Sequence, residues 1–350
     1  MKILSHTKLY IVVLLSVMVF AVWTLVIGSS PLSRNAKGVR VVIAKGSTAR
    51  RVAEILGEQG VIRSPFVFSL TCRISGFGAK IKPGVYELSP AMSVQQIIRE
   101  LVAGDSLETW LVVPEGYTAR QIADTLQAKK LASSEEFLRF ALTKGYDFPE
   151  HPFIYRHNLE GYLFPDTYLI PRDSYPDSII NQMLKTFDDK VIAPNREEIR
   201  HVIMLRFKMG DGSFEEGLQR ILTMASLVER EAKLSQDRPM IAAVLWNRLS
   251  KRMRLEVDAT VSYRPGESTQ NKGRVFYSDL ESDSPYNTYK HYGLPPAPIC
   301  NPGLASIKAV LHPAAMDALF YVAKKDGSHV FSKTFQEHLK VKNAIKNGRL

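Results

Sequence analysis

The chain has 350 residues, 45% of them hydrophobic, and a formal net charge of +11. This length favours two to three domains with hydrophobic cores, and this charge suits an anionic surface, either membrane headgroups or an acidic polymer. Nucleic acid is excluded as the expected partner, because Lys and Arg are scattered and no zinc-finger, homeodomain or RNA-motif signature occurs. Cys72 and Cys300 lie far apart without metal-ligand spacing, so we expect two buried apolar residues rather than a disulfide.

The N-terminal segment is expected to cross a membrane once. No charged residue occurs from Leu9 to Ile27, which as a helix is roughly as long as the hydrocarbon core is thick. Lys2 and Lys8 precede this run, which predicts a cytoplasmic tail at 1–8, an anchor at 9–28 and an extracytoplasmic remainder. The run is longer than the apolar part of a cleaved signal peptide, about 7 to 15 residues, so an uncleaved anchor is favoured. Residues 29–38 form a short polar linker.

An internal repeat follows the linker. VVIAKGSTARRVAEIL at 41–56 returns as LVVPEGYTARQIADTL at 111–126, and each copy reads as a strand, a glycine turn, a capping Thr and an amphipathic helix. Between the copies we expect a helix at 64–75, a strand at 84–88 and a helix at 94–101, with a further helix at 134–143. Strand, helix, helix, strand is typical of LysM-like glycan-binding modules, so we interpret 39–150 as a LysM-like region. A packing domain that only spaces the rest of the chain from the membrane is the alternative.

Residues 151–350 are expected to form the second α+β domain. Its first motif is EGYLFPDTY at 160–168, which reads as a buried strand. Tyr162, Phe164 and Asp166 are candidates for a sugar subsite, since aromatic rings stack on pyranose faces. The rings of Tyr162, Phe164 and Tyr168 are equally compatible with an ordinary core. Beyond this motif we expect helices at 177–187, 196–205 and 239–249, strands at 318–323 and 329–332, and a basic helix at 335–350.

One carboxyl in the segment ILTMASLVEREAKL, residues 221–234, is the candidate general acid. At about 100° per residue, Thr223 and Ser226 fall on the solvated side of a helix and Glu229 falls on the shoulder of the apolar arc. Desolvation there should raise the pKa of Glu229, and a carboxyl that is still protonated near neutral pH suits a general acid. The alternative is a structural Glu paired with Arg230 or Lys233. Glu231 falls about 200° around the helix from Glu229, so we do not expect it to reach the same bond.

Five motifs together resemble the endolytic murein transglycosylases, the YceG-like or MltG family. The motifs occur in the family's order: EGYLFPDTY, ASLVERE at 225–231, NRL at 247–249, VDATVSY at 257–263 and YNTYKHYGLPPAPICNPG at 286–303. Two departures are Ala259, where the family usually has Pro, and Glu256, where Gln is common.

The resemblance implies a single-pass membrane enzyme whose α+β exterior cuts peptidoglycan strands between N-acetylmuramic acid and N-acetylglucosamine. It implies that Glu229 protonates the glycosidic oxygen and then removes the proton of the muramic acid C6 hydroxyl, which leaves a 1,6-anhydro end without consuming water. It also implies cleavage within nascent strands, near penicillin-binding proteins and the elongation or division machinery. The candidate substrate-binding residues beyond the first motif are Ser226, Asn247, Asp258, Thr260, Tyr286, Asn287, Thr288 and Tyr289.

No cofactor or metal is expected. His291, His312, His329 and His338 lack metal-ligand spacing, and no nucleotide-binding or serine-hydrolase motif occurs. Two alternative functions remain open. One is a non-catalytic membrane scaffold that binds the cell wall, and the other is a two-carboxylate muramidase that releases reducing ends.

Overall fold

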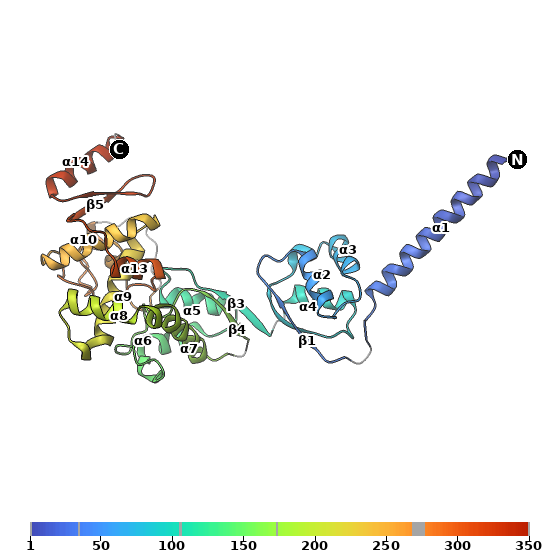
Figure 1. The fold of residues 1–350 in the computed structure, drawn as a ribbon, viewed down its shortest axis with the longest axis horizontal. Coiled ribbons are helices and arrows are strands. Elements are labelled where there is room, and N and C mark those ends of the chain that lie inside the picture. Colours follow the sequence, from blue (N-terminus) through green and yellow to red (C-terminus); the bar gives the residue numbers. More distant parts are fainter. Residues whose placement is uncertain (1, 34–35, 105–106, 173, 268–276, 349–350) are drawn as a thin grey trace. The chain divides into compact units, whose positions relative to one another are not determined.

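A computed structural model describes residues 2–33, 36–104, 107–172, 174–267 and 277–348 (Figure 1). It is a mixed α+β structure, as the sequence predicts. The chain forms two compact units, Met1–Leu111 with Leu169–Arg172 and Val112–Tyr168 with Asp173–Leu350. This division falls earlier in the chain than residue 150, so the two copies of the sequence repeat belong to different units.

The first unit contains the strand, helix, helix, strand order that the sequence predicts. Its elements are α1 (Lys2–Ser29), β1 (Val39–Ile43), α2 (Ala49–Glu58), α3 (Pro65–Ser75), β2 (Gly84–Leu88) and α4 (Val94–Ala103). β1 pairs antiparallel with β2, with Val41 opposite Tyr86. The hydroxyl groups of Thr48, Ser64 and Ser93 cap α2, α3 and α4 by accepting main-chain N–H bonds. These caps explain why the predicted helix starts are correct.

The core of the first unit lies between this strand pair and the helices. Its members are buried side chains: Val41, Ile43, Val52, Leu56, Phe68, Cys72, Tyr86, Leu88, Ile97 and Leu101. Each fully buried aliphatic side chain contributes about 1.5 to 3 kcal/mol. Cys72 is a free, buried thiol, and so is Cys300 in the second unit, as predicted.

α1 covers the segment for which the sequence predicts a membrane anchor. In the part of the chain that the structure describes, no helix combines the length and the apolar content needed to cross a membrane. The anchor therefore stays a prediction.

The second unit is largely helical. Its helices are α5 (Ala119–Ala128), α6 (Ser134–Thr143), α7 (Pro176–Phe187), α8 (Ala193–Val202), α9 (Phe214–Glu231), α10 (Arg238–Ser250), α11 (Ala259–Ser262), α12 (Tyr277–Leu280), α13 (Leu304–Leu311) and α14 (Phe335–Lys346). Short 3₁₀ or π turns lie at Gly78–Lys80, Gly145–Asp147, Asp188–Ile192, Ile203–Phe207, Asp211–Ser213 and Ser235–Asp237. The basic C-terminal helix predicted to residue 350 ends at Lys346, and residues 349–350 lie outside the described residues.

Four strands complete the molecule. β3 (Glu108–Val112) and β4 (Thr167–Pro171) extend the first sheet in the order β1-β2-β3-β4, and β5 (Phe320–Ala323) pairs antiparallel with β6 (His329–Ser332). The β5–β6 hairpin and α14, both red in Figure 1, pack against each other, and β5 contacts α10.

α9 is the central helix of the second unit, and it is buried nearly all round. Thr223 and Ser226, predicted to face solvent, are 2% and 0% exposed. The prediction is wrong because both hydroxyls donate to carbonyl groups of their own helix, that of Thr223 to Gln219 O and that of Ser226 to Thr223 O. With these polar atoms satisfied, α9 packs against α8, α10, α11 and α13. The helix ends at Glu231, earlier than the predicted Leu234.

Candidate active site

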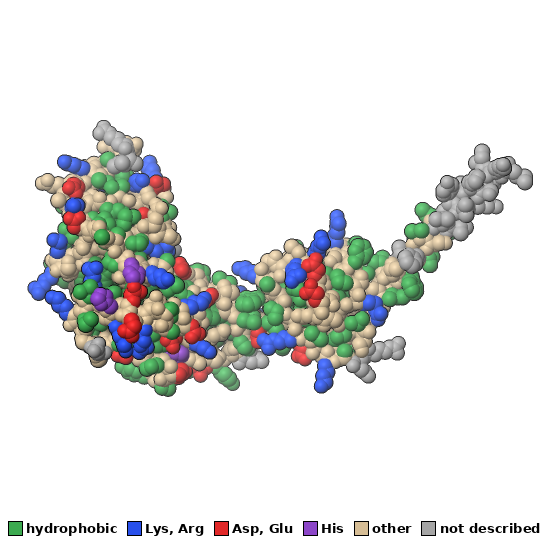
Figure 2. Space-filling model, viewed as in Figure 1, with side chains coloured by type: hydrophobic (Ala, Val, Ile, Leu, Met, Phe, Trp, Pro, Cys, Tyr) green, Lys and Arg blue, Asp and Glu red, His purple; other side chains and the backbone are tan. Residues whose placement is uncertain are grey.

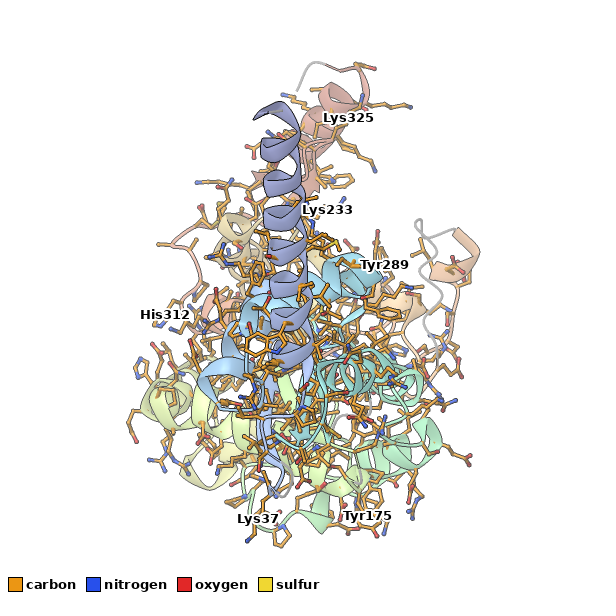
Figure 3. All side chains as sticks on the ribbon, turned by 90° about the vertical axis from the view of Figure 1, so that its right-hand side faces the viewer. Lys37, Tyr175, Lys233, Tyr289, His312 and Lys325 are labelled. Atoms are coloured by element: carbon orange, nitrogen blue, oxygen red, sulfur yellow. The ribbon has the colours of Figure 1, made fainter. Side chains whose placement is uncertain are left out.

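A cavity of about 360 Å³ opens in the second unit where α9 ends. It is lined by charged and aromatic residues from several elements: Glu231 from α9, Arg248, Glu256 and Asp258 from α10 and the segment after it, Tyr289 from the loop that precedes α13, Tyr321 and His329 from the β5–β6 hairpin, and His338 and Lys342 from α14. Tyr289 is labelled in Figure 3. On the visible face of the second unit, basic and acidic side chains are interspersed (Figure 2).

Two of these groups, Tyr321 and His329, are brought together by the register of the β5–β6 hairpin. Tyr321 pairs with Phe331 and Ala323 pairs with His329, so these four residues share one face of the two-stranded sheet. The rings of Tyr321 and His329 meet edge to face with centroids 5.6 Å apart. The hairpin thus presents a hydroxyl and an imidazole to the cavity.

Glu231 is the carboxyl of this cavity with an unusual pKa. Its Oε2 accepts a hydrogen bond of 3.0 Å from the Tyr321 hydroxyl. Burial raises the pKa of Glu231 to about 7, with Asp258 adding to the rise and Tyr321 and Arg230 opposing it. A carboxyl that is half protonated at neutral pH, beside a cavity, is equipped to deliver a proton.

Glu229 occupies a different environment, away from the lining of that cavity. Its side chain is 7% exposed, and its Oε2 accepts a 3.0 Å hydrogen bond from the main-chain N–H of Gly303, which immediately precedes α13. Its Oε1 lies 3.3 Å from the Arg238 guanidinium, which is also 3.8 Å from Glu115. The negative charge of Glu229 is therefore balanced by Arg238 and by the positive end of α13. The partner is not Arg230 or Lys233.

The structure thus gives Glu231 the setting that the sequence predicts for Glu229. The helical projection separates Glu231 from Glu229, and the two carboxyls do lie in different environments, but the projection cannot show the cavity beside Glu231. A helical projection describes only the helix itself, and the outer side of the last turn of α9 is covered by β5, which lies about 90 residues further along the chain, as the Tyr321–Glu231 hydrogen bond shows.

Two of the predicted substrate-binding residues line the cavity. Asp258 and Tyr289 are joined by a 2.5 Å hydrogen bond from the Tyr289 hydroxyl to Asp258 Oδ1. Burial and Asp258 both raise the pKa of the Tyr289 hydroxyl above its ordinary value, so it remains a donor. This pair forms a polar wall of the cavity.

Three other predicted binding residues do not line the cavity but form hydrogen bonds next to Asp258 and Tyr289. Thr260 and Thr288 are buried, with their hydroxyl oxygens 2.9 Å apart, and Thr288 Oγ1 accepts from Val257 N. The Asn287 side chain donates to two carbonyls, those of Leu280 and Ser282. These bonds tie the segment that carries Asp258 to the loop that carries Tyr289.

Three more predicted residues are structural in this geometry. Ser226 is fully buried and accepts from Ile299 N. Tyr286 packs edge to face against Tyr263, and burial raises its pKa to about 12. Asn247 donates to the carbonyls of Met316 and Ala318, and so fixes the chain that enters β5.

The motif at 160–168 is not a buried strand. Its first residues form a turn and an irregular segment, and only Thr167 and Tyr168 belong to β4. Gly161 has a left-handed φ of 93°, and a side chain there would lie 2.5 Å from Pro298, while Pro165 offers no N–H to a ladder. The turn is therefore built into the sequence.

The aromatic residues of this motif are core, not a subsite wall. Tyr162 and Phe164 are 0% and 5% exposed and pack against Phe187. Asp166 forms an ion pair with Lys190 outside the cavity. The core interpretation of these aromatic residues is the one that the structure supports.

Glu160, at the start of the motif, is a second buried carboxyl that the sequence did not single out. It is 1% exposed and accepts three hydrogen bonds, from Ala119 N, Asn301 Nδ2 and the Tyr263 hydroxyl. Burial raises its pKa to about 7, against the effect of these donors. Glu160 does not line the cavity, so it links buried segments rather than meeting a ligand.

Among the residues that the structure describes, no group of His, Cys, Asp and Glu could hold a metal ion. Sequence reasoning missed Arg248, Tyr321 and His329 as cavity residues. Tyr321 and His329 share one face of the hairpin because of its register. The sequence predicts the two short strands but does not show this register.

Together these features define an α+β protein with one desolvated acid in a cavity lined by aromatic and charged groups. The chain belongs to the YceG-like family, whose model matches residues 41–344. It is 35% identical over 327 residues to a protein of Bacillus subtilis (strain 168) named endolytic murein transglycosylase, a match that covers 89% of this chain and 86% of that protein. The resemblance noted from the motifs is thereby confirmed.

Two further relatives agree. A protein of the same name from Streptococcus pneumoniae serotype 2 is 30% identical over 334 residues, which cover 88% of this chain and 58% of that longer protein. The crystal structure of a YceG-like protein from Listeria monocytogenes has 37% sequence identity and a TM-score of 0.62, over 87% of this chain and 99% of that chain.

Proposed function

We propose that this protein is an endolytic murein transglycosylase that cleaves the bond between N-acetylmuramic acid and N-acetylglucosamine and leaves 1,6-anhydro ends. Family membership and the names of the relatives support this function. The observation that carries it is Glu231, a carboxyl with a pKa of about 7 beside a cavity. A non-catalytic wall-binding scaffold has no need of such a group.

The catalytic acid in this proposal is Glu231 rather than Glu229. Protonated Glu231 gives its proton to the glycosidic oxygen as the bond to C1 of the muramic acid breaks through an oxocarbenium-like state. The C6 hydroxyl of the same sugar then closes on C1 and loses its proton, so water is not consumed. Asp258 and Tyr289 are positioned on the cavity wall to bind the sugar's polar groups or to stabilise the developing positive charge.

A hydrolytic muramidase is the second candidate, because a second carboxylate, Asp258, lines the same cavity as Glu231. A hydrolase uses one carboxyl as acid and another as base or nucleophile. The two candidates differ in the sugar end that they release.

Mass analysis of glycan ends tests the proposal. The full-length protein in detergent is incubated with uncrosslinked murein glycan, with Glu231→Gln as the blank. We expect cleavage within long strands, which creates new 1,6-anhydro-muramic acid ends and no new reducing ends. Reducing ends would instead establish the muramidase.

The finer features predicted from sequence belong to the same proposal. We propose that residues 9–28 anchor the protein in the bacterial plasma membrane with residues 1–8 in the cytoplasm, and that it meets penicillin-binding proteins and the elongation or division machinery outside. The uncharged run from Leu9 to Ile27 supports the anchor. A reporter fused after Leu350 is expected to be active only outside the cytoplasm, and cytoplasmic activity would contradict this topology.

We also propose that the β1-α2-α3-β2 segment of the first unit is a LysM-like module that binds glycan. The order of its elements and the antiparallel β1–β2 pair support this assignment. Deletion of residues 39–103 is expected to weaken co-sedimentation with purified sacculi. Unchanged sedimentation would favour a spacer.

A further inference from the structure

A buried histidine–aspartate pair faces the same cavity as Glu231. His329 Nδ1 and the His329 main-chain nitrogen both lie 2.9 Å from Asp237 Oδ2. The side chains of His329 and Asp237 are each 3% exposed. The two residues are 92 positions apart in the chain, so the fold brings them together. His329 is one of the residues that line the cavity.

The hydrogen bonds of Asp237 fix the tautomer of this histidine. An ionised carboxylate can only accept, so the proton of a neutral imidazole sits on Nδ1 and the lone pair on Nε2. In the described part of the chain, Nε2 has no hydrogen-bond partner. Because Asp237 occupies the Nδ1 edge of the His329 ring, the Nε2 edge is the one left for a ligand. A base held in one orientation by a carboxylate is the arrangement that activates hydroxyl groups in many enzymes.

Tyr321 connects this pair to the acid. Its hydroxyl donates to Glu231, and its ring lies edge to face on the His329 ring at 5.6 Å. Both residues belong to the same face of the β5–β6 hairpin. Glu231 and His329 therefore line one cavity, and each of them contacts Tyr321.

We propose that His329 is the catalytic base for the C6 hydroxyl of the substrate muramic acid, with Asp237 as its positioning residue. This inference rests on the proposed transglycosylase function and deepens it. The bond from C1 to the glycosidic oxygen breaks, and its electron pair stays on that oxygen, which takes the proton of Glu231. O6 forms the new bond to C1, and its proton passes to Nε2 of His329. The net transfer is one proton from Glu231 to His329, which solvent reverses once the products leave the open cavity.

Two groups divide a task that one carboxyl would otherwise perform in sequence. A single carboxylate has to reach the glycosidic oxygen first and O6 afterwards. With His329 in place, Asp237 orients the base before the bond breaks. Ring closure then competes well with capture of the oxocarbenium-like sugar by water.

The ratio of 1,6-anhydro ends to reducing ends tests this assignment in the full-length protein. In His329→Gln we expect turnover to fall by about 10²-fold or more and the share of reducing ends among the remaining products to rise. Asp237→Asn, which keeps the imidazole, should shift the ratio in the same direction by less. His312→Gln is the matched control, because His312 (labelled in Figure 3) is 63% exposed and pairs with Glu198 outside the cavity.

A histidine that only supports the fold would lower the rate without changing which ends form. An unchanged ratio in His329→Gln, at whatever rate, would therefore overturn the assignment, and thermal melting of each variant accounts for lost folded protein. Wild-type enzyme that releases only reducing ends would overturn the proposed function itself, which is a separate outcome.

Discussion

Glu229 and Glu231 lie two residues apart near the end of α9, yet they belong to different regions of the protein. Glu229 is enclosed with Arg238 and the main-chain N–H of Gly303, so its charge is met by a cation and a helix terminus. Glu231 meets one neutral donor, Tyr321, at the edge of a cavity, and burial raises its pKa to about 7. The two environments illustrate that burial alone does not make an acid. The neighbours distinguish the two carboxyls: an arginine and a main-chain N–H contact Glu229, and a tyrosine hydroxyl contacts Glu231.

The largest expected effect comes from Glu231→Gln. Gln keeps the shape of the side chain and can accept from Tyr321, but it has no proton to deliver. We expect turnover to fall by about 10² to 10⁴-fold or more, with binding of glycan and the melting temperature nearly unchanged. Release of glycan fragments over time measures the rate. Near wild-type turnover in this variant would remove Glu231 from the mechanism.

Glu160 sharpens the comparison, because it shares the pKa of Glu231 without sharing its cavity. Folding raises the pKa of Glu160 from 4.5 to about 7. Between these two pH values the folded protein keeps a proton on Glu160 that the unfolded chain releases. The stabilisation that this proton contributes is therefore fully present below pH 4.5 and is lost as pH rises through about 7. The shift corresponds to about 3 kcal/mol in the free energy of unfolding.

The variant Glu160→Gln should flatten this pH dependence and leave turnover close to the wild-type rate. Gln can accept from Ala119 N and Asn301, and the Tyr263 hydroxyl can turn to accept from its amide. Denaturant unfolding at pH 5 and pH 7.5 measures the change. An undiminished fall in stability between these pH values would mean that Glu160 does not hold the proton.

Glu229→Gln should act on stability rather than on chemistry, and it has the smallest expected effect. The variant loses the charge that faces Arg238 and the start of α13, although Glu115 remains near Arg238. We expect a loss of about 1 to 3 kcal/mol in the free energy of unfolding. Glu216→Gln, which breaks an exposed pair with Arg220, is the control and should cost less than about 1 kcal/mol. Equal melting temperatures for the two variants would contradict the structural role of Glu229.

Local sequence signals predicted many elements correctly. The bounds of β2, α6 and β6 agree with the predictions, because capping residues and glycine turns act within a few residues of each helix or strand end. Asp258 and Tyr289, two of the residues predicted to bind substrate, line the cavity. The turn at 160–166 was missed, because its cause, the close approach of Gly161 to Pro298, involves residues far apart in the chain.

The choice between the two carboxyls depends on tertiary contacts in the same way. The position of Glu231 depends on the hairpin that covers the last turn of α9, and the environment of Glu229 depends on Arg238 and Gly303. A periodicity computed within residues 221–234 contains none of these partners. Helical geometry could locate the carboxyls on the helix, but only the tertiary structure could tell which of them lines this cavity.

The pH dependence of turnover, measured for the wild type and for two variants, tests most directly which carboxyl is the acid. Glu231 must be protonated to act, so the wild-type rate should fall as pH rises through about 7. Tyr321→Phe removes a donor that stabilises the carboxylate, which raises the pKa of Glu231 and moves the fall to higher pH. Glu229→Gln should leave the fall where it is in the wild type. A fall that moves in Glu229→Gln and stays in place in Tyr321→Phe would contradict the assignment of Glu231.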